Sequence, residues 1–165
     1  MRSDIRSGQS GAALRLRLRI ASVLGCLPVP GATVELWQCN ADGDYSEYSD
    51  FGTADQNWLR GFQVTDASGI VEFVTIYPGW YPGRSVHVHI RVKREGRPDF
   101  VSQLYFDDAV TDSVLALAPY TAHVGTRPRN GDDGIFVGDG GSELVLAVKS
   151  MGGELRASFD VNVPA

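Results

Sequence analysis

The alternation of apolar and polar side chains along short segments is the feature that most constrains the fold of this chain. Apolar residues alternate with arginines from Leu14 to Ile20, and residues 70–76, 87–92 and 100–106 follow the same two-residue period. Successive side chains of a β-strand point to opposite faces, so this period indicates strands that are buried on one side. The arginines of the first strand are expected on its solvent face.

Glycine and proline divide the chain into many short elements, since it carries 19 glycines and 8 prolines. Between these turn residues, further strands are predicted at 32–39, 60–65, 143–149 and 155–163. Strands at short spacing with turns between them indicate an all-β fold: an antiparallel β-sandwich with long connecting loops and at most one short helix. That helix is expected from about Asp112 to Ala118, ended by Pro119.

The length of 165 residues suits one domain. Residues 1–12 are expected to form an N-terminal arm and residues 13–165 a single catalytic domain. The net charge of −5 is spread along the chain, which argues against nucleic acid and an anionic membrane surface as partners. No apolar stretch is long enough to cross a bilayer, and no signal peptide is recognisable at the start of the chain.

His87 and His89 lie two residues apart on a predicted strand, so both imidazoles share one face. Such a pair is half of a metal site, although imidazole suits Zn, Cu, Fe and Ni alike. A strand histidine is as often a hydrogen-bonded residue of the core or the sheet edge. A metal site is favoured because Tyr81 and Arg84 lie just before the pair and Tyr45 lies in an earlier loop.

Tyr45, Tyr81, His87 and His89 together form a set of two phenols and two imidazoles. A free phenol has a pKa of about 10, so a phenolate near neutral pH needs a strong Lewis acid beside it. Ferric iron is such an ion and prefers anionic oxygen. Zinc sites more often use Cys, His or carboxylate ligands, so the set favours Fe(III).

Three blocks of residues resemble the intradiol ring-cleavage dioxygenases. The first block comprises Gly31 to Trp37 and Asp42 to Ser46. The second comprises Arg60, Gly61, Thr65 to Gly69, Phe73, Pro78, Gly79, Tyr81, Arg84 and His87 to His89. The third is Ser102 to Phe106, so the resemblance extends from about Leu14 to Phe106.

The resemblance implies a non-haem Fe(III) dioxygenase that uses O₂ to cleave the ring of catechol or simple substituted catechols. Cleavage would fall between the two hydroxyl-bearing carbons and give muconate-type diacids. Tyr45 and His87 would be equatorial metal ligands, and Tyr81 and His89 axial ones. The partners of such an enzyme are a small catechol and O₂.

Three catalytic residues follow from the same resemblance. Tyr81 would leave the metal as the catechol binds, and its phenolate would then act as a base. Arg84 would stabilise negative charge on the ring. Gln103 matches a family position that lines the same pocket.

The chain also departs from many family members. Only Pro82 and Gly83 separate Tyr81 from Arg84, where many members have a longer insertion, so a more open site with a broader choice of catechols is expected. The short form with Cys26 and Cys39 resembles the exported branch of the family, which implies a disulfide between them and a secreted enzyme, compatible with one module of a longer secreted chain. From the residues alone, two free core thiols fit nearly as well.

Two other classes compete with this interpretation. Transthyretin-like spacer modules share several of the turn motifs and bind no metal. A cupin-type metalloenzyme would join the His87/His89 pair to a carboxylate and a later histidine, for which Glu95 and His123 are the candidates. Of the remaining aromatic residues, Tyr77 and Trp80 are expected near the mouth of the pocket.

Overall fold

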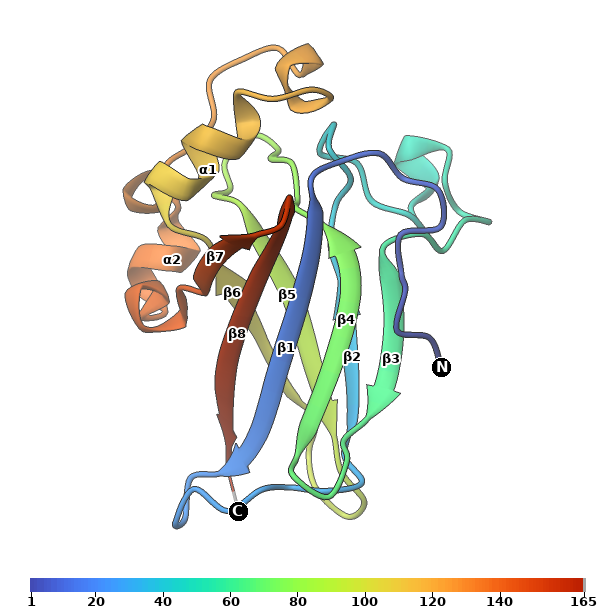
Figure 1. Ribbon diagram of the computed structural model, residues 1–165, viewed down its shortest axis with the longest axis vertical. Helices are drawn as coiled ribbons and strands as arrows, with labels where there is room; N and C mark the ends of the chain where they lie inside the picture. Colours follow the sequence, from blue (N-terminus) through green and yellow to red (C-terminus); the bar gives the residue numbers. More distant parts are fainter. Residues whose placement is uncertain (165) are drawn as a thin grey trace.

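Two four-stranded sheets pack face to face in the computed structural model, which describes residues 1–164 (Figure 1). The strands of the first sheet are, in order, β4 (Ile70–Ile76), β1 (Ala13–Ser22), β8 (Glu154–Val163) and β7 (Ala147–Met151). The strands of the second are β3 (Arg60–Val64), β2 (Thr33–Trp37), β5 (His87–Lys93) and β6 (Phe100–Tyr105). The prediction of a mostly β fold is confirmed.

The pairing of the first and last strands corrects one part of that prediction. β1 and β8 run parallel, from Leu14 opposite Leu155 to Ser22 opposite Val163, while the neighbouring pairs β1–β4 and β7–β8 are antiparallel. A fully antiparallel arrangement is therefore wrong. Side-chain alternation fixes which face of a strand is buried, but it carries no information about the direction of the neighbouring strand.

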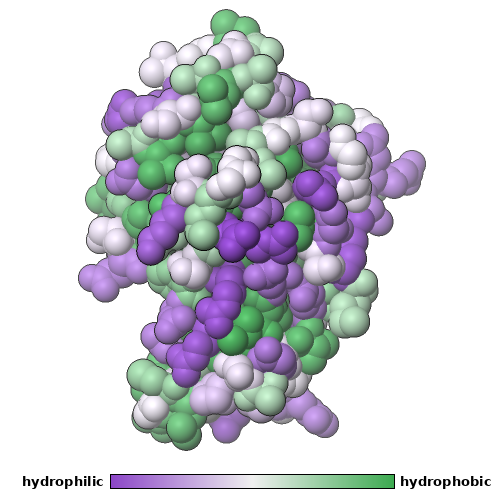
Figure 2. All heavy atoms as spheres, in the orientation of Figure 1, coloured by the Kyte–Doolittle hydropathy of each residue, from purple (hydrophilic) through white to green (hydrophobic). Residues whose placement is uncertain are grey.

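The core lies between the two sheets and is built by the alternating residues. Leu14, Leu16 and Leu18 of β1 are fully buried, as are the apolar residues of β5, which face them across one continuous cluster. On the other face of β1, Arg15 pairs with Glu72 at 2.8 Å and with Glu154 at 3.2 Å. Figure 2 shows hydrophilic side chains gathered over the middle of this sheet, as predicted for the arginine face.

The helical segments differ from the prediction at their ends and in number. Helix α1 (Asp108–Leu115) begins before Asp112 because the Asp107 carboxylate accepts hydrogen bonds from the backbone of Ala109 and Val110. A second helix, α2 (Gly134–Gly138), is capped by Asp133, so the expectation of at most one helix is wrong. Short 3₁₀ turns cover Ser49–Phe51, Tyr120–Ala122, Asn130–Asp132 and Gly141–Leu144. The last of these occupies the start of the strand predicted at 143–149.

The N-terminal arm is ordered and touches both sheets. Ile5 is fully buried. Its N–H donates to the Val74 carbonyl at 2.9 Å, and its carbonyl accepts from the N–H of Leu59 at 2.7 Å. None of the helices within the described part of the chain is long and apolar enough to cross a membrane.

Cys26 and Cys39 are both free thiols, which corrects the expected disulfide. Cys26 lies in the exposed turn before β2, whereas Cys39 is buried just beyond the other end of that strand. Two cysteines at opposite ends of a strand do not meet the short Cα separation that a disulfide requires. Burial raises the pKa of the Cys39 thiol to about 12. The expected export therefore loses its support from a disulfide.

Candidate metal centre

The two histidines of β5 place their Nε2 atoms 3.1 Å apart at one end of the second sheet. The His87 ring is fixed because its Nδ1–H donates to the Ser85 carbonyl at 2.7 Å, which leaves Nε2 as the free acceptor. The His89 ring stacks on Trp37, its neighbour across the β2–β5 pair, with centroids 4.8 Å apart and planes 2° from parallel. Both Nε2 atoms therefore face one point on the outer side of the sheet.

Tyr81 reaches the same point from a tight turn just before β5. The Arg84 N–H bonds to the Tyr81 carbonyl at 3.2 Å, with Pro82 second and Gly83 at φ +83° third, as in a type II turn. Tyr81 Oη lies 3.2 Å from His87 Nε2, and Arg84 Nη1 lies 3.5 Å from the same oxygen. The two-residue linker thus brings Tyr81 and Arg84 together.

Tyr45 approaches from the loop that follows β2. Its ring centroid lies 5.7 Å from that of Tyr81 and 6.0 Å from that of His89. Its backbone is held on one side by the Thr53 hydroxyl, which donates to the Tyr45 carbonyl. Its own hydroxyl is buried and has no hydrogen-bond partner among residues 1–164. A buried hydroxyl without a hydrogen-bond partner destabilises a native fold, and a bound ligand would supply the missing partner of this atom.

Close contact between two loops sets the distance between Tyr45 and Tyr81. A Cβ on Gly79 would lie 2.4 Å from the Ala41 carbonyl oxygen. On Gly43, whose φ is +90°, a Cβ would lie 2.2 Å from the Trp80 carbonyl oxygen. Only glycine permits these approaches, so the glycines of the two motifs serve to bring the two phenols together.

Burial controls the ionisation of the four side chains. It raises the pKa of Tyr45, to which nearby Cys39 and Tyr81 add, and it also raises the pKa of Tyr81. It lowers the pKa of His87 to about 4 and that of His89 to about 3. At neutral pH the imidazoles are therefore in the neutral form that binds metals, while the phenols need a nearby cation to ionise.

These residues fit a bound metal ion. The Nε2 atoms of the two imidazoles, 3.1 Å apart and beside a phenol without a partner, form with it a set of ligand atoms that a cation would satisfy. Within the described residues, no three His, Cys, Asp or Glu side chains are grouped to hold a metal, so the phenols are needed for a complete set. The cupin alternative is therefore wrong, because Glu95 and His123 do not lie together with His87 and His89.

Arg84 and Gln103 lie beside the four side chains. Gln103 lies opposite His89 in the β5–β6 pair, and its Oε1 accepts hydrogen bonds from Arg84 Nη2 and, at 3.1 Å, from the Tyr105 hydroxyl. Arg84 is anchored from behind by Asp133, with Nε 3.0 Å from Oδ2. The guanidinium therefore faces the candidate metal centre while its charge is compensated on the far side.

The sequence interpretation missed Asp133 and the role of Ser85, and it misplaced Tyr77. Asp133 lies in a Gly/Asp-rich segment, where its only local signal is an aspartate directly before a short apolar run, typical of a helix N-cap. Tyr77 is fully buried and its hydroxyl bonds Thr111 at 2.7 Å, so it does not line the mouth of the pocket.

An open pocket of about 390 Å³ adjoins the two phenols. Its lining includes Asp42, Asp44, Tyr45, Tyr48, Phe51, Tyr81 and His123. Trp80, expected near the pocket mouth, lies behind this wall and stacks on His123 with centroids 4.2 Å apart. The pocket is therefore mainly aromatic, with carboxylates on one side.

Comparison with known proteins points to one family. A family model described as "Dioxygenase" matches residues 2–129. A chlorocatechol 1,2-dioxygenase of Rhodococcus opacus is 30% identical over 129 residues, which cover 66% of this chain and 49% of that protein. A catechol 1,2-dioxygenase of Candida albicans is 32% identical over 54% of this chain and 36% of that protein. The chain thus spans half or less of the length of these two relatives.

Solved structures agree in fold over nearly the whole chain. An intradiol ring-cleavage dioxygenase from Tetranychus urticae superposes with a TM-score of 0.95 at 28% identity, covering 99% of this chain and 86% of that one. The dioxygenase domain of a carbohydrate-binding fusion protein from Streptomyces sp. SirexAA-E superposes with a TM-score of 0.76 at 27% identity, covering 99% and 87%. These similarities do not favour the transthyretin-like alternative.

Proposed function

Because this chain belongs to the intradiol ring-cleaving dioxygenase family, we propose that it is a non-haem Fe(III) enzyme acting on catechols. In the proposed reaction both atoms of O₂ enter the substrate, and the ring opens between its two hydroxyl-bearing carbons to give a muconate-type diacid. The observation that carries the proposal is the buried, unpartnered Tyr45 hydroxyl beside Tyr81, His87 and His89.

Tyr45, Tyr81, His87 and His89 would hold the metal. Bound there, Fe(III) would supply the Lewis acidity that keeps the phenols ionised and withdraws electron density from an ionised catechol. The neutral histidines are ready to bind without losing a proton, because burial already disfavours their charged form.

Tyr81 is the better placed of the two phenols to accept a proton. Its side chain is partly exposed and sits on a short turn at the wall of the pocket. The Arg84 guanidinium, 3.5 Å from its oxygen, favours the phenolate, which is the form that can accept a proton. Tyr45 is more deeply buried and has no such cation within hydrogen-bond distance. A catechol hydroxyl entering from the pocket would therefore transfer its proton to Tyr81 Oη.

Arg84 would stabilise negative charge that develops on the ring. Its Nη atoms face Tyr81 and Gln103, while Nε is bound to Asp133, so its charge is oriented before the substrate arrives. Fixed donors aimed at developing charge are usually worth about 10²–10³ in rate. Gln103 would hold one edge of the guanidinium in place.

The pocket beside the phenols favours uncharged catechols. Among the residues that line it in the described part of the chain are two aspartates and neither lysine nor arginine. A ring carboxylate would meet like charge there, so catechol and simple substituted catechols are the proposed substrates and carboxylated catechols are disfavoured.

A visible spectrum of the iron-loaded protein tests the proposal. We expect a phenolate-to-iron charge-transfer band that shifts when catechol is added, with O₂ uptake and formation of a diacid. Tyr45→Phe should weaken the band and metal binding, because it removes one anionic ligand. A colourless protein that neither binds iron nor consumes O₂ with any catechol would overturn the proposal and favour a spacer module.

A further inference from the structure

Asp133 is a fully buried carboxylate that reaches the candidate metal centre from outside the sheet. It is the N-cap of α2, where Oδ1 accepts from the N–H of Ile135 at 2.9 Å and of Phe136 at 3.4 Å. A helix as short as Gly134–Gly138, with two glycines, has little stability of its own. A capping role alone does not account for a buried charge at this position.

The other hydrogen bonds of Asp133 go to two consecutive residues of the site. Arg84 Nε lies 3.2 Å from Oδ1 and 3.0 Å from Oδ2. The Ser85 backbone N–H and hydroxyl each donate to Oδ2 at 3.0 Å. Burial acts to raise the pKa of Asp133, but these donors and the Ile135 N–H outweigh it and hold the pKa below its usual range. The buried charge is thus fully compensated.

Both contacts lead directly to groups of the site. With Nε bound to Asp133, the guanidinium plane of Arg84 is set so that Nη1 faces Tyr81 Oη and Nη2 faces Gln103 Oε1. Ser85, held by the same carboxylate, presents its carbonyl to His87 Nδ1 at 2.7 Å. One aspartate therefore orients the arginine and also contacts Ser85, the residue whose carbonyl binds His87.

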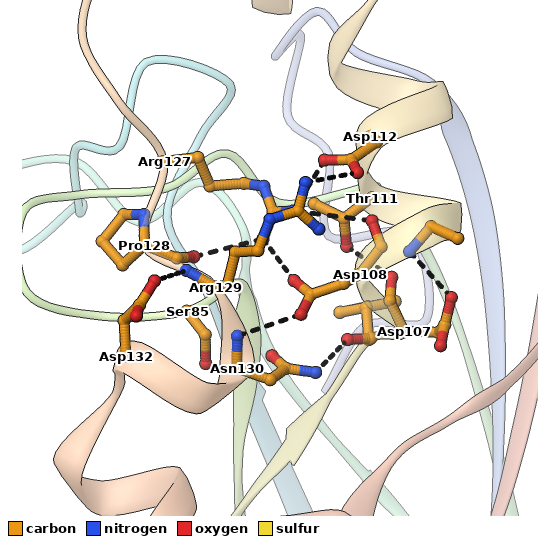
Figure 3. A network of polar contacts seen from close by, with 12 residues as sticks. Ser85, Asp107, Asp108, Thr111, Asp112, Arg127, Pro128, Arg129, Asn130 and Asp132 are labelled. Atoms are coloured by element: carbon orange, nitrogen blue, oxygen red, sulfur yellow. Dashed lines mark hydrogen bonds and ion pairs between the residues drawn. The ribbon is translucent and has the colours of Figure 1, made fainter.

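The segment that leads to Asp133 is held against helix α1, as Figure 3 shows for Arg127 and Asn130 beside Asp108. Arg127 binds Asp108 at 2.6 Å and Asp112 at 2.7 Å, both on the helix. Asn130 donates through its backbone N–H to Asp108 at 3.2 Å and through its side chain to the Phe106 carbonyl at 2.9 Å. These contacts with helix α1 therefore hold the segment that precedes Asp133, and so help to hold Asp133 beside Arg84.

We propose that Asp133 is a positioning residue of this enzyme, acting through Arg84 to hold the guanidinium toward the reacting ring. The kinetic part of this inference rests on the proposed function. Its structural part, the Arg84–Asp133 contact, can be measured without turnover.

Kinetics of Asp133→Asn on the iron-loaded protein test the inference. The amide has no charge to pair with Arg84 and one acceptor oxygen in place of two, so it cannot serve all the donors that Oδ1 and Oδ2 now serve. We therefore expect kcat/KM for catechol to fall about 10- to 100-fold, mainly in kcat. Asp132→Asn, an exposed neighbouring carboxylate, should leave kcat/KM unchanged. Iron content and the charge-transfer band should persist in both variants, because all four proposed ligands remain.

A double-mutant cycle separates positioning from a general structural effect. In an Arg84→Gln background, Asp133→Asn should cost less than about threefold further, because its effect passes through Arg84. Equal costs in both backgrounds, or unchanged kinetics in the single Asp133→Asn variant of an active enzyme, would overturn the inference alone. A wild-type protein without iron binding or turnover would instead overturn the proposed function, and the role of Asp133 with it.

The metal-free protein provides the measurement independent of activity. In its ¹⁵N spectrum the Arg84 Nε–H should exchange slowly with solvent compared with that of exposed Arg97, and Asp133→Asn should abolish this protection. If Asp133→Asn fails to fold, Asp133→Glu keeps the charge and should retain partial protection and activity. An Arg84 Nε–H that exchanges as fast as that of Arg97 in the wild type would overturn the contact.

Discussion

At the residue scale, the two histidines of the site are held by different means. His87 is held by a hydrogen bond from Nδ1 to the Ser85 carbonyl, whereas His89 is held by stacking on Trp37. Arg91 covers the same tryptophan at 5.7 Å. Trp37 thus orients one of the four proposed metal ligands.

Replacing Trp37 tests this role. Trp37→Ala should leave the His89 ring free to turn, and we expect iron affinity to fall about 10- to 100-fold, the usual cost of losing a partner that orients a ligand. Trp37→Phe keeps a stacking ring and should retain most of the affinity. Competition with a chelator, followed by the colour of the protein, measures both. Equal iron retention by Trp37→Ala and the wild type would contradict the role.

At the element scale, the site depends on two loops that touch through glycines. Gly79→Ala would place a Cβ 2.4 Å from the Ala41 carbonyl oxygen and 2.6 Å from that of Asn40. These oxygens belong to the loop that carries Tyr45, so the loop must move. We expect a loss of about 1–3 kcal/mol in unfolding free energy and a weaker charge-transfer band. Gly138→Ala, whose Cβ would meet nothing within 4 Å, is the matched control: it should leave the band unchanged and should not destabilise the fold, since alanine suits a helix better than glycine. An unchanged band in Gly79→Ala would contradict the argument.

The elements also show what the sequence can predict. β5 was predicted closely because burial of Val88, Ile90 and Val92 leaves a clear two-residue period, and that period also put His87 and His89 on one face. Strand direction leaves no such period, since it depends on where the chain returns in space. The caps of the two helices are marked only by single aspartates before short segments, Asp107 and Asp133.

The residues of the candidate site divide in the same way. Tyr45, Tyr81 and Arg84 lie in recognisable sequence motifs, so the sequence was enough to assign them to one site with the histidine pair. Asp133 reaches Arg84 only through tertiary contacts of a glycine-rich segment, and no local pattern reports such a contact. The expected Cys26–Cys39 disulfide was wrong because it rested on the resemblance to the exported branch, whereas the strand between the two cysteines holds them apart.

At the scale of the whole molecule, the last strand of the chain, β8, pairs with the first strand, β1. Arg15 of β1 stands between Glu72 of β4 and Glu154 of β8, so one arginine ties three strands on the outer face. Hydrogen bonding to Arg15 holds the pKa of Glu154 below its usual range. A carboxylate whose pKa is depressed in the folded state favours folding above its unfolded pKa and loses that contribution as pH falls through the folded pKa.

The Arg15–Glu154 pair predicts that the protein loses stability as pH falls, and replacing Glu154 should reduce this loss. At pH 7, Glu154→Gln should unfold at a lower urea concentration than the wild type, because Arg15 loses an ionic partner. The two proteins should converge as pH falls through the depressed folded-state pKa of Glu154, since Glu154 is then protonated in the wild type as well. High salt should shrink the difference at pH 7, because the pair lies at the surface. Urea titrations between pH 3 and pH 7 measure the effect. A gap between the two proteins that is as large at pH 3 as at pH 7 would show that Glu154 stabilises the sheet by packing and not by charge.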